Sequence, residues 1–302
     1  MLFTYLVFNL GFNCNFHCKY CFRNYNDKSI LPNMPTEKLK TWLKENATNY
    51  SRIAVNGGEP LLYMDAIKEL FSCVPKWMDK RIITNGSLLT KDIVDYCNDN
   101  NVMVTISHDG KVTKFLRGRD VLEEKLDLIR SIKRLAFTTV ISKYNINILE
   151  NIKYIDYKVN RKDIIHIINN YMDNGEDDPL IKDFDYEMYR KYYTEYLETL
   201  VKNKHINIFT DRDELLGTQL LLNGDIVELQ TLKRYGSIFD NEETILNNIK
   251  PDLEKCNCKY KSICTFKKQL ASKHNCKMYQ MTIHSKNFYK GDYNENLDKY
   301  GC

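Results

Sequence analysis

Residues 14–21 read CNFHCKYC and place three cysteines, Cys14, Cys18 and Cys21, on one short segment. The segment follows an apolar, β-rich run, Phe3 to Asn9, which predicts a buried strand. Three thiolates on one loop can hold three irons of a [4Fe–4S] cluster, whereas an electron-carrying ferredoxin adds a fourth. A metal site accepts substrate through an open coordination position. The segment therefore predicts an iron–sulfur centre with one position left for another ligand.

The composition is that of an ordinary globular protein. The chain has 302 residues, of which 43% are hydrophobic and 28% charged, which argues against a fibrous, coiled-coil or wholly disordered chain. Its length allows two domains, or one large α/β barrel with an appendage. The net charge of +4 is too small to indicate a nucleic-acid partner.

The cysteine distribution and the apolar runs indicate the cellular compartment of the protein. The 10 cysteines are grouped rather than spread, which indicates metal binding rather than a disulfide scaffold. No run reaches the roughly eighteen apolar residues of a membrane helix, so we expect no membrane partner. The opening MLFTYLVFNL has neither the basic region nor the cleavage site of an export signal. We therefore expect a protein of the reducing cytoplasm.

Short apolar runs alternate with helical patterns over the first half of the chain, which is typical of βα units and a parallel sheet. We expect strands at Phe3 to Asn9, Arg52 to Val55, Arg81 to Thr84, Val102 to Ser107, Ala136 to Ser142 and Asp163 to Ile168. We expect helices near Thr36 to Glu45, Asp65 to Trp77, Lys91 to Asn98 and Asp120 to Lys133. Pro35 suits a first helical position, and Thr90 can cap the helix that follows it. The predicted fold is an α/β, partial (β/α)6 TIM-like barrel.

The second half of the chain adds a long helix, a hairpin and a cysteine-rich tail. Residues 183–204 read as one amphipathic helix with tyrosines at helical spacing, which predicts a stripe that packs against the barrel. Asn223 and Gly224 form a hairpin signal between two short strands. We place a domain boundary near residue 210, with the barrel at 1–210 and a small cysteine-rich domain at 211–302, which the resemblance given below makes an iron–sulfur domain.

Three short motifs fall at the ends of predicted strands. They are Gly57-Gly58-Glu59-Pro60, Thr84-Asn85-Gly86-Ser87 and Ser107-His108-Asp109-Gly110. Each alone is typical of a tight turn. Because barrel ligands bind where strands end, the three motifs together favour a binding site at that edge. His108 is a candidate for lining this pocket.

The spacing Cys14-x3-Cys18-x2-Cys21, with aromatic Tyr20 before the last cysteine, resembles the cluster motif of the radical S-adenosylmethionine (SAM) superfamily. The resemblance covers roughly residues 3 to 145. It implies a [4Fe–4S] cluster whose unique iron chelates the amino and carboxylate groups of SAM. An electron from the cluster then cleaves the sulfonium, and the resulting 5′-deoxyadenosyl radical abstracts hydrogen from a substrate.

The strand-end motifs gain roles from the same resemblance. Gly57, Gly58 and Glu59 are similar to the family's GGE motif, which implies that Glu59 contacts the SAM amine. Asn85 lies in a stretch similar to the family's TNG, and Ser107 in one similar to its S-x-DG. Ser107 is then the expected contact of the ribose or the carboxylate of SAM.

Zinc is the alternative at the first cysteine group, since Cys-rich loops also bind zinc. His17 directly precedes Cys18, and at that spacing both can hardly bind one tetrahedral ion. This favours iron and sulfur. Cys73 and Cys97 lie singly on predicted helices and read as buried, inert thiols, while the role of Cys302 stays open.

A second group of four cysteines lies near the C-terminus, at Cys256, Cys258, Cys264 and Cys276. The group resembles a reduced SPASM or twitch domain, the C-terminal module of radical SAM maturases, and so implies one auxiliary [4Fe–4S] cluster. It departs from the full pattern in its first pair, C-x-C, and in Lys268, which stands where a cysteine is expected. Four thiolates also suit a structural zinc ion, so zinc stays open at this group.

The SPASM-type resemblance implies a ribosomally made peptide as substrate, modified by epimerisation or by a carbon–sulfur or carbon–carbon crosslink. The strand at Phe3 leaves no room for an N-terminal leader-binding domain, which weakens that interpretation. A small metabolite or a tRNA base is the alternative substrate. A non-catalytic iron–sulfur or zinc protein is the alternative of another class. A ferredoxin or flavodoxin is the expected reductant.

Overall fold

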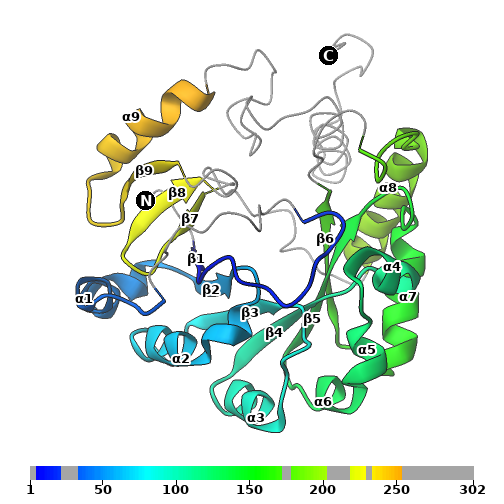
Figure 1. Cartoon of the computed structure of the whole chain (residues 1–302), viewed down its shortest axis with the longest axis horizontal. Helices are drawn as coiled ribbons and strands as arrows, with labels where there is room; N and C mark the ends of the chain where they lie inside the picture. Colours follow the sequence, from blue (N-terminus) through cyan, green and yellow to red (C-terminus); the bar gives the residue numbers. More distant parts are fainter. Residues whose placement is uncertain (1–4, 22–32, 172–177, 203–217, 229–232, 254–302) are drawn as a thin grey trace.

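The computed structural model describes residues 5–21, 33–171, 178–202, 218–228 and 233–253 (Figure 1). One nine-stranded sheet runs through the molecule in the order β6-β5-β4-β3-β2-β1-β7-β8-β9. Its first six strands pair in parallel, each with the next in sequence. They are β1 (Leu6–Asn9), β2 (Arg52–Asn56), β3 (Asp79–Thr84), β4 (Val102–Ser107), β5 (Leu135–Ile141) and β6 (Ile165–Asn170). The sheet curves within a ring of helices, as in a partial barrel (Figure 1). The predicted fold class is confirmed.

Helices cover the outer face of this sheet because each connection between parallel strands must cross over it. They are α1 (Glu37–Asn46), α2 (Met64–Ser72), α3 (Lys91–Asp99), α4 (Thr113–Arg117), α5 (Val121–Glu124), α6 (Leu126–Arg130), α7 (Ile148–Val159) and α8 (Tyr186–Lys202). Short 3-10 turns lie at η1 (Ala47–Asn49), η2 (Pro60–Tyr63) and η3 (Gly110–Val112). In the part of the chain that the structure describes, no helix is both long and apolar enough to cross a bilayer.

Local capping explains where several helices begin. The Thr90 side chain accepts a hydrogen bond from the backbone N–H of Ile93 at 3.3 Å, which confirms Thr90 as a cap. Thr36 caps α1 in the same way through Leu39. The prediction that Pro35 occupies the first helical position was wrong, because Thr36 is the cap and Pro35 precedes it.

Other helix boundaries also differ from the sequence expectation. The helix expected up to Trp77 ends at Ser72, three residues before the proline at 75. The helix expected over Asp120 to Lys133 is divided into α5 and α6, because Lys125 leaves the helical conformation. The sequence pattern did not predict α4 or α7.

The core lies between the sheet and the helices, where the strands present apolar side chains that are almost wholly buried. A second apolar cluster forms beside β6, where Tyr189, Tyr193 and Tyr196 of α8 are buried. The tyrosine stripe therefore packs against the barrel, as predicted. These two clusters fix the strand ends that carry the motifs.

The last described strands continue the same sheet. β7 (Thr218–Leu220) pairs in parallel with β1, and β8 (Asp225–Glu228) and β9 (Arg234–Ser237) follow antiparallel. Gly224 turns the β7–β8 hairpin with a φ of 88°, which confirms the hairpin signal. After α9 (Glu242–Leu253), the cysteine-rich tail lies outside the described residues, as does the expected boundary near residue 210.

Candidate active site

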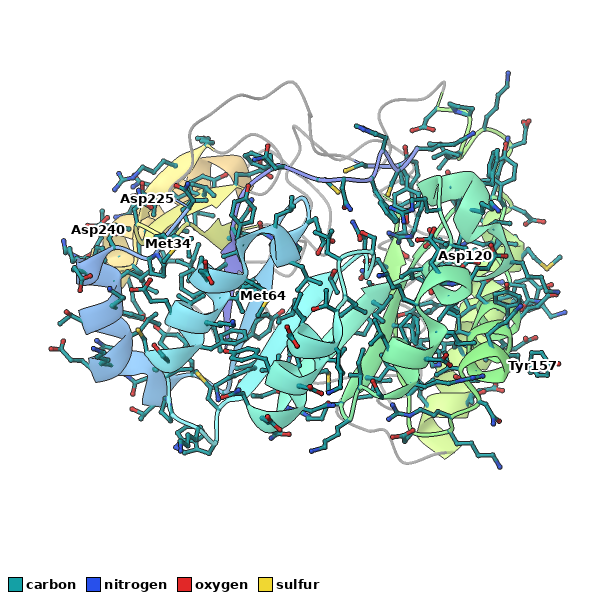
Figure 2. The ribbon with its side chains drawn as sticks, turned by 60° about the horizontal axis from the view of Figure 1, so that its bottom comes forward. Met34, Met64, Asp120, Tyr157, Asp225 and Asp240 are labelled. Carbon is teal, nitrogen blue, oxygen red and sulfur yellow. The ribbon has the colours of Figure 1, made fainter. Side chains whose placement is uncertain are left out.

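The three cysteines of the N-terminal group lie on a segment that crosses the carboxyl ends of the strands. In Figure 1 this dark-blue segment leaves β1 and passes over the barrel toward β6. Figure 2 shows it along the upper edge of the sheet, running toward the part of the fold that carries Asp120. Cys14, Cys18 and Cys21 are all half-buried. We call residues 14–21 the cysteine loop.

The glycines of the GGE motif hold the start of this loop. The backbone N–H of Gly58 donates to the carbonyl of Gly11 at 2.7 Å, and that of Glu59 donates to the carbonyl of Asn13 at 2.8 Å. A Cβ atom on Gly58 would lie 2.2 Å from the Asn13 carbonyl oxygen, which is impossible. The motif therefore needs glycine at position 58 because the segment between β1 and Cys14 packs directly against it.

Glu59 is completely buried, with 0% of its surface exposed. Its Oε1 accepts from the N–H of Leu61 at 3.0 Å and from Oγ1 of Thr84 at 2.6 Å. Its Oε2 accepts from the N–H of Asn85 at 2.8 Å and has the capacity for one more donor. Burial raises the pKa of this carboxyl, and the three hydrogen bonds act against that shift. Glu59 therefore joins the turns that follow β2 and β3.

Asn85 connects Glu59 to the first cysteine of the loop, because its backbone bonds Glu59 and its side chain faces Cys14. Its Oδ1 accepts from the N–H and from the hydroxyl of Ser87, at 2.9 and 2.6 Å. This orients Nδ2 toward the Cys14 sulfur, 3.8 Å away, and toward Oδ1 of Asn15 at 2.9 Å. The backbone N–H of Phe16 also points at the Cys14 sulfur, at 3.4 Å. Two N–H donors on one sulfur suit a thiolate that binds iron, since such donors tune a cluster.

The other end of the cysteine loop is tied to the turn after β4. The Tyr20 hydroxyl donates to Oδ2 of Asp109 at 2.5 Å. The Arg117 guanidinium grips the same carboxylate, with Nε 2.8 Å from Oδ2 and a terminal nitrogen 3.2 Å from Oδ1. The N–H of Lys19 donates to the carbonyl of Leu116 at 2.8 Å. Tyr20 and Asp109 both lie in motifs that the sequence shows, but the motif of Asp109 predicted only a tight turn, and no sequence signal pointed to Arg117.

The charges of Asp109 and Arg117 act on the thiol of Cys18, the second cysteine of the loop. Burial raises the pKa of the Cys18 thiol to about 11, and the nearby Arg117 charge acts against that shift. Burial also raises the pKa of Cys14. A metal bound by these thiols would have to displace their protons. Arg117 is the nearby buried positive charge that favours a thiolate at Cys18.

In the third strand-end motif, Ser107-His108-Asp109-Gly110, Ser107 lies at the site and His108 lies in the interior. Ser107 ends β4 and is half-buried, at the edge where the other motifs lie. His108 is fully buried, with Nε2 3.0 Å from Oδ1 of Asp120 and Nδ1 3.0 Å from Oγ1 of Thr113. The suggestion that His108 lines the pocket was wrong. His108 follows the last residue of β4, and its hydrogen bonds to Thr113 and Asp120 hold it within the connection after that strand.

The structure describes the three loop cysteines but not the second cysteine group. Within the described ranges, no three His, Cys, Asp or Glu side chains form a group that could hold one metal ion. A tetrahedral zinc ion needs its thiolates within about 2.3 Å of one centre, whereas a cubane takes each thiolate on a different iron. Cys73 and Cys97 are buried thiols, as expected. The second cysteine group, Cys256, Cys258, Cys264 and Cys276, lies outside the described residues, as does Cys302.

Comparison with known families bears on the whole region from β1 to the start of β6. A family model described as "Radical SAM superfamily" matches residues 8–164, about half of the chain. A radical SAM cyclopropyl synthase, TigE, of Paramaledivibacter caminithermalis is 27% identical over 166 residues, covering 46% of this chain and 35% of that protein. An S-adenosylmethionine-dependent nucleotide dehydratase of Flammeovirga pacifica is 29% identical over 225 residues, covering 68% and 75%. This chain thus spans about a third of the length of the first relative.

A solved structure shares the fold over nearly all of both chains. It is described as native anSMEcpe with bound AdoMet and Kp18Cys peptide. The TM-score is 0.66 and the identity 18%, and the match covers 94% of this chain and 97% of the other. At this identity the likeness concerns the fold alone.

Proposed function

The chain belongs to the radical SAM superfamily, and we propose that it cleaves SAM reductively with a [4Fe–4S] cluster held by Cys14, Cys18 and Cys21. When bound, the cluster supplies the electron that breaks the sulfonium bond and so starts hydrogen abstraction from a substrate. The observation that carries the proposal is the contact between the cysteine loop and the strand-end motifs. Gly58 packs on the carbonyl of Asn13, and Asn85 points its amide at the Cys14 sulfur.

The protein's own groups have distinct parts in this proposal. Asn85 and the Phe16 N–H stabilise the Cys14 thiolate, while Arg117 balances the charge near Cys18. Glu59 fixes the turn that carries Asn85, and its place in the GGE motif assigns it to the SAM amine. Gly57 and Gly58 set the distance between that turn and the cysteine loop. Ser107, at the neighbouring strand end, contacts the ribose or carboxylate of SAM.

We propose a ribosomally made peptide as the substrate, modified by epimerisation or by a carbon–sulfur or carbon–carbon crosslink. The fold likeness to a protein whose structure contains both AdoMet and a peptide supports this choice. A second candidate is a nucleotide or another small metabolite. It is favoured by the nucleotide dehydratase, which this chain matches over three quarters of that relative's length. A tRNA base belongs to the same alternative.

We further propose one auxiliary [4Fe–4S] cluster on Cys256, Cys258, Cys264 and Cys276, in a domain over residues 211–302. The number of thiolates suits a closed cluster, which would take no part in binding SAM. A low-potential carrier such as a ferredoxin or flavodoxin would supply electrons, in a reducing cytoplasm. These statements rest on the cysteine pattern and on family membership.

The proposal is tested by anaerobic reconstitution with iron and sulfide, followed by incubation with SAM and dithionite. We expect 5′-deoxyadenosine from the wild-type protein and none from the variant in which all three loop cysteines are alanine. Cys97→Ala is the matched control, because that thiol is buried on α3 away from the loop. Zinc in place of iron, or no nucleoside product, would overturn the proposal. Adding candidate peptides or nucleotides then separates the two substrate classes.

A further inference from the structure

The buried ion pair of Asp109 and Arg117 is held in one orientation. Oδ2 of Asp109 accepts from the Tyr20 hydroxyl at 2.5 Å and from Nε of Arg117 at 2.8 Å. Its Oδ1 accepts from a terminal nitrogen of Arg117 at 3.2 Å and from the backbone N–H of Val140 at 3.0 Å. Four donors on two oxygens fix this carboxylate, and with it the guanidinium that it binds.

Water screens the charges of this pair only weakly. Asp109 is 0% exposed and Arg117 is 6% exposed. Burial alone would lower the pKa of Arg117, but the carboxylate of Asp109 raises it above its usual range, so the guanidinium keeps its charge. A buried charge acts over a longer distance than one at the surface, because less water and salt lie around it.

The positive end of the pair lies toward the cysteine loop. The N–H of Lys19, which follows Cys18, donates to the carbonyl of Leu116, which precedes Arg117, at 2.8 Å. Burial raises the pKa of the Cys18 thiol to about 11, and the Arg117 charge opposes this shift more strongly than the Asp109 charge adds to it. At Cys18 the pair therefore acts as a net positive charge.

Other cations of the same region lie at the surface. Arg119 has 47% of its side chain exposed and bonds Glu124, with Nε 3.0 Å from Oε1. Lys19 is an exposed residue of the cysteine loop. Solvent and salt reduce the effect of such surface charges. Of these three cations, Arg117 is the one whose charge is screened least.

We propose that the Asp109–Arg117 pair sets the reduction potential of the metal centre on the cysteine loop, with Arg117 raising that potential and Asp109 limiting the rise. The inference rests on the proposed function, because it needs an iron–sulfur cluster on this loop. Reduction adds one negative charge to such a centre and breaks no bond, so a fixed positive charge beside Cys18 favours the reduced form. The pair then makes the centre easier to reduce, while Asp109 keeps it able to pass the electron on.

The test measures the potential of the centre in the reconstituted full chain, by titration with dithionite followed by electron paramagnetic resonance. Arg117→Gln removes the positive charge, Asp109→Asn removes the negative one, and Arg117→Lys keeps the charge but loses the two-pronged grip. Arg52→Gln is the matched control, because Arg52 bonds Asp79 at 2.8 Å where β2 and β3 begin, at the opposite end of the sheet. Iron per chain shows whether each variant holds the centre.

The two charge variants should move the potential in opposite directions. Arg117→Gln should make reduction about 10-fold less favourable, which for one electron is a potential about 59 mV lower. Asp109→Asn should make reduction about 3-fold more favourable, since its charge acts less strongly at Cys18. Arg117→Lys should lie within about 3-fold of the wild type, because the charge is kept. The Arg52 control should match the wild type.

Three results would overturn this assignment. The first is an unchanged potential in Arg117→Gln at full iron content, and the second is a shift of both charge variants in the same direction, which indicates distortion of the loop. The third is loss of iron from all three variants of the pair, which would assign the pair to folding. Where one charge variant alone loses its iron, the sign of the shift in the other decides.

Failure of the proposed function looks different from failure of the tuning role. If the wild-type protein holds no iron–sulfur cluster, or holds one and forms no 5′-deoxyadenosine from SAM with dithionite, the proposed function fails. If the wild type does both and the potential ignores the charges of Asp109 and Arg117, only the tuning role fails.

Discussion

The hydroxyl of Tyr20 donates a hydrogen bond of 2.5 Å to the carboxylate of Asp109, although 89 positions separate them in the chain. Asp109 is 0% exposed and also holds the nearly buried Arg117, whose guanidinium carbon lies 5.1 Å from the centre of the Tyr20 ring. The middle of the cysteine loop is thus fastened to a buried ion pair. Its position relative to the strand ends depends on groups that do not bind metal.

The first prediction concerns this fastening. Asp109→Asn removes one charge of a buried pair and should lower the free energy of unfolding by about 3 kcal/mol or more. Tyr20→Phe loses one hydrogen bond and should cost about 1 kcal/mol. Urea unfolding of the metal-free protein measures both, with Tyr157→Phe as the control, since Tyr157 is 81% exposed. Equal effects of the Asp109 and Tyr157 changes would contradict the buried pair.

The second prediction concerns the glycine contact. Gly58→Ala forces a Cβ atom into the Asn13 carbonyl and should move the cysteine loop off the GGE turn. We expect loss of most reconstituted iron, measured per chain. Gly118→Ala is the control, because a φ of 83° strains alanine there while its Cβ meets nothing within 4 Å. Normal iron content in Gly58→Ala would show that this packing is dispensable.

The third prediction concerns the donor to the Cys14 sulfur. Asn85→Ala removes an N–H aimed at that sulfur and should weaken cluster binding about 10-fold. It should also lower the reduction potential, because donors to cluster sulfurs favour the reduced, more negative form. A redox titration followed by electron paramagnetic resonance measures the potential. Asn15→Ala, which removes the hydrogen bonds of Asn15 with Asn85 at 2.9 Å and with Ser87 at 2.8 Å and leaves the sulfur contact, should retain the wild-type value.

The fourth prediction is a pH dependence at the opposite end of the sheet. Burial tends to raise the pKa of Asp79, but Arg134, Arg81 and Arg52 hold it below its usual range. Because the pKa of Asp79 is lower in the folded state than its unfolded value near 3.9, the charged carboxylate stabilises the fold at any pH above 3.9. This stability is lost as the pH falls through the folded-state pKa. Asp79→Asn should cost about 2 kcal/mol at pH 7. Its stability should also fall less steeply than that of the wild type below about pH 4.

The fifth prediction counts the clusters. With two [4Fe–4S] clusters the reconstituted protein should hold about eight irons per chain, and about four when Cys256, Cys258, Cys264 and Cys276 are all alanine. Iron analysis together with zinc analysis makes the measurement. Four irons accompanied by one zinc in the wild type would replace the auxiliary cluster by a structural zinc ion. The loop-cysteine variant should lose the other four irons.

Much of the fold follows from local sequence pattern. The strand at Val102–Ser107 lies where its apolar run predicts it, and Thr90 caps the helix as its side chain allows. Strand and cap signals are readable because they depend on neighbouring residues. The helix boundaries were less accurate, since Lys125 breaks a pattern that looks continuous in the sequence. The break depends on packing, which periodicity does not record.

The sequence by itself determined the cysteine spacing, the order of the six parallel strands, and the motifs that end three of them. Only the tertiary structure decided what those motifs touch: that Glu59 is buried between two turns, that Asn85 faces Cys14, and that Asp109 joins Tyr20 to Arg117. The physical reason is the parallel sheet. Its register brings strand ends from distant parts of the chain to one edge, and the contacts made there are set by that register rather than by any spacing along the chain.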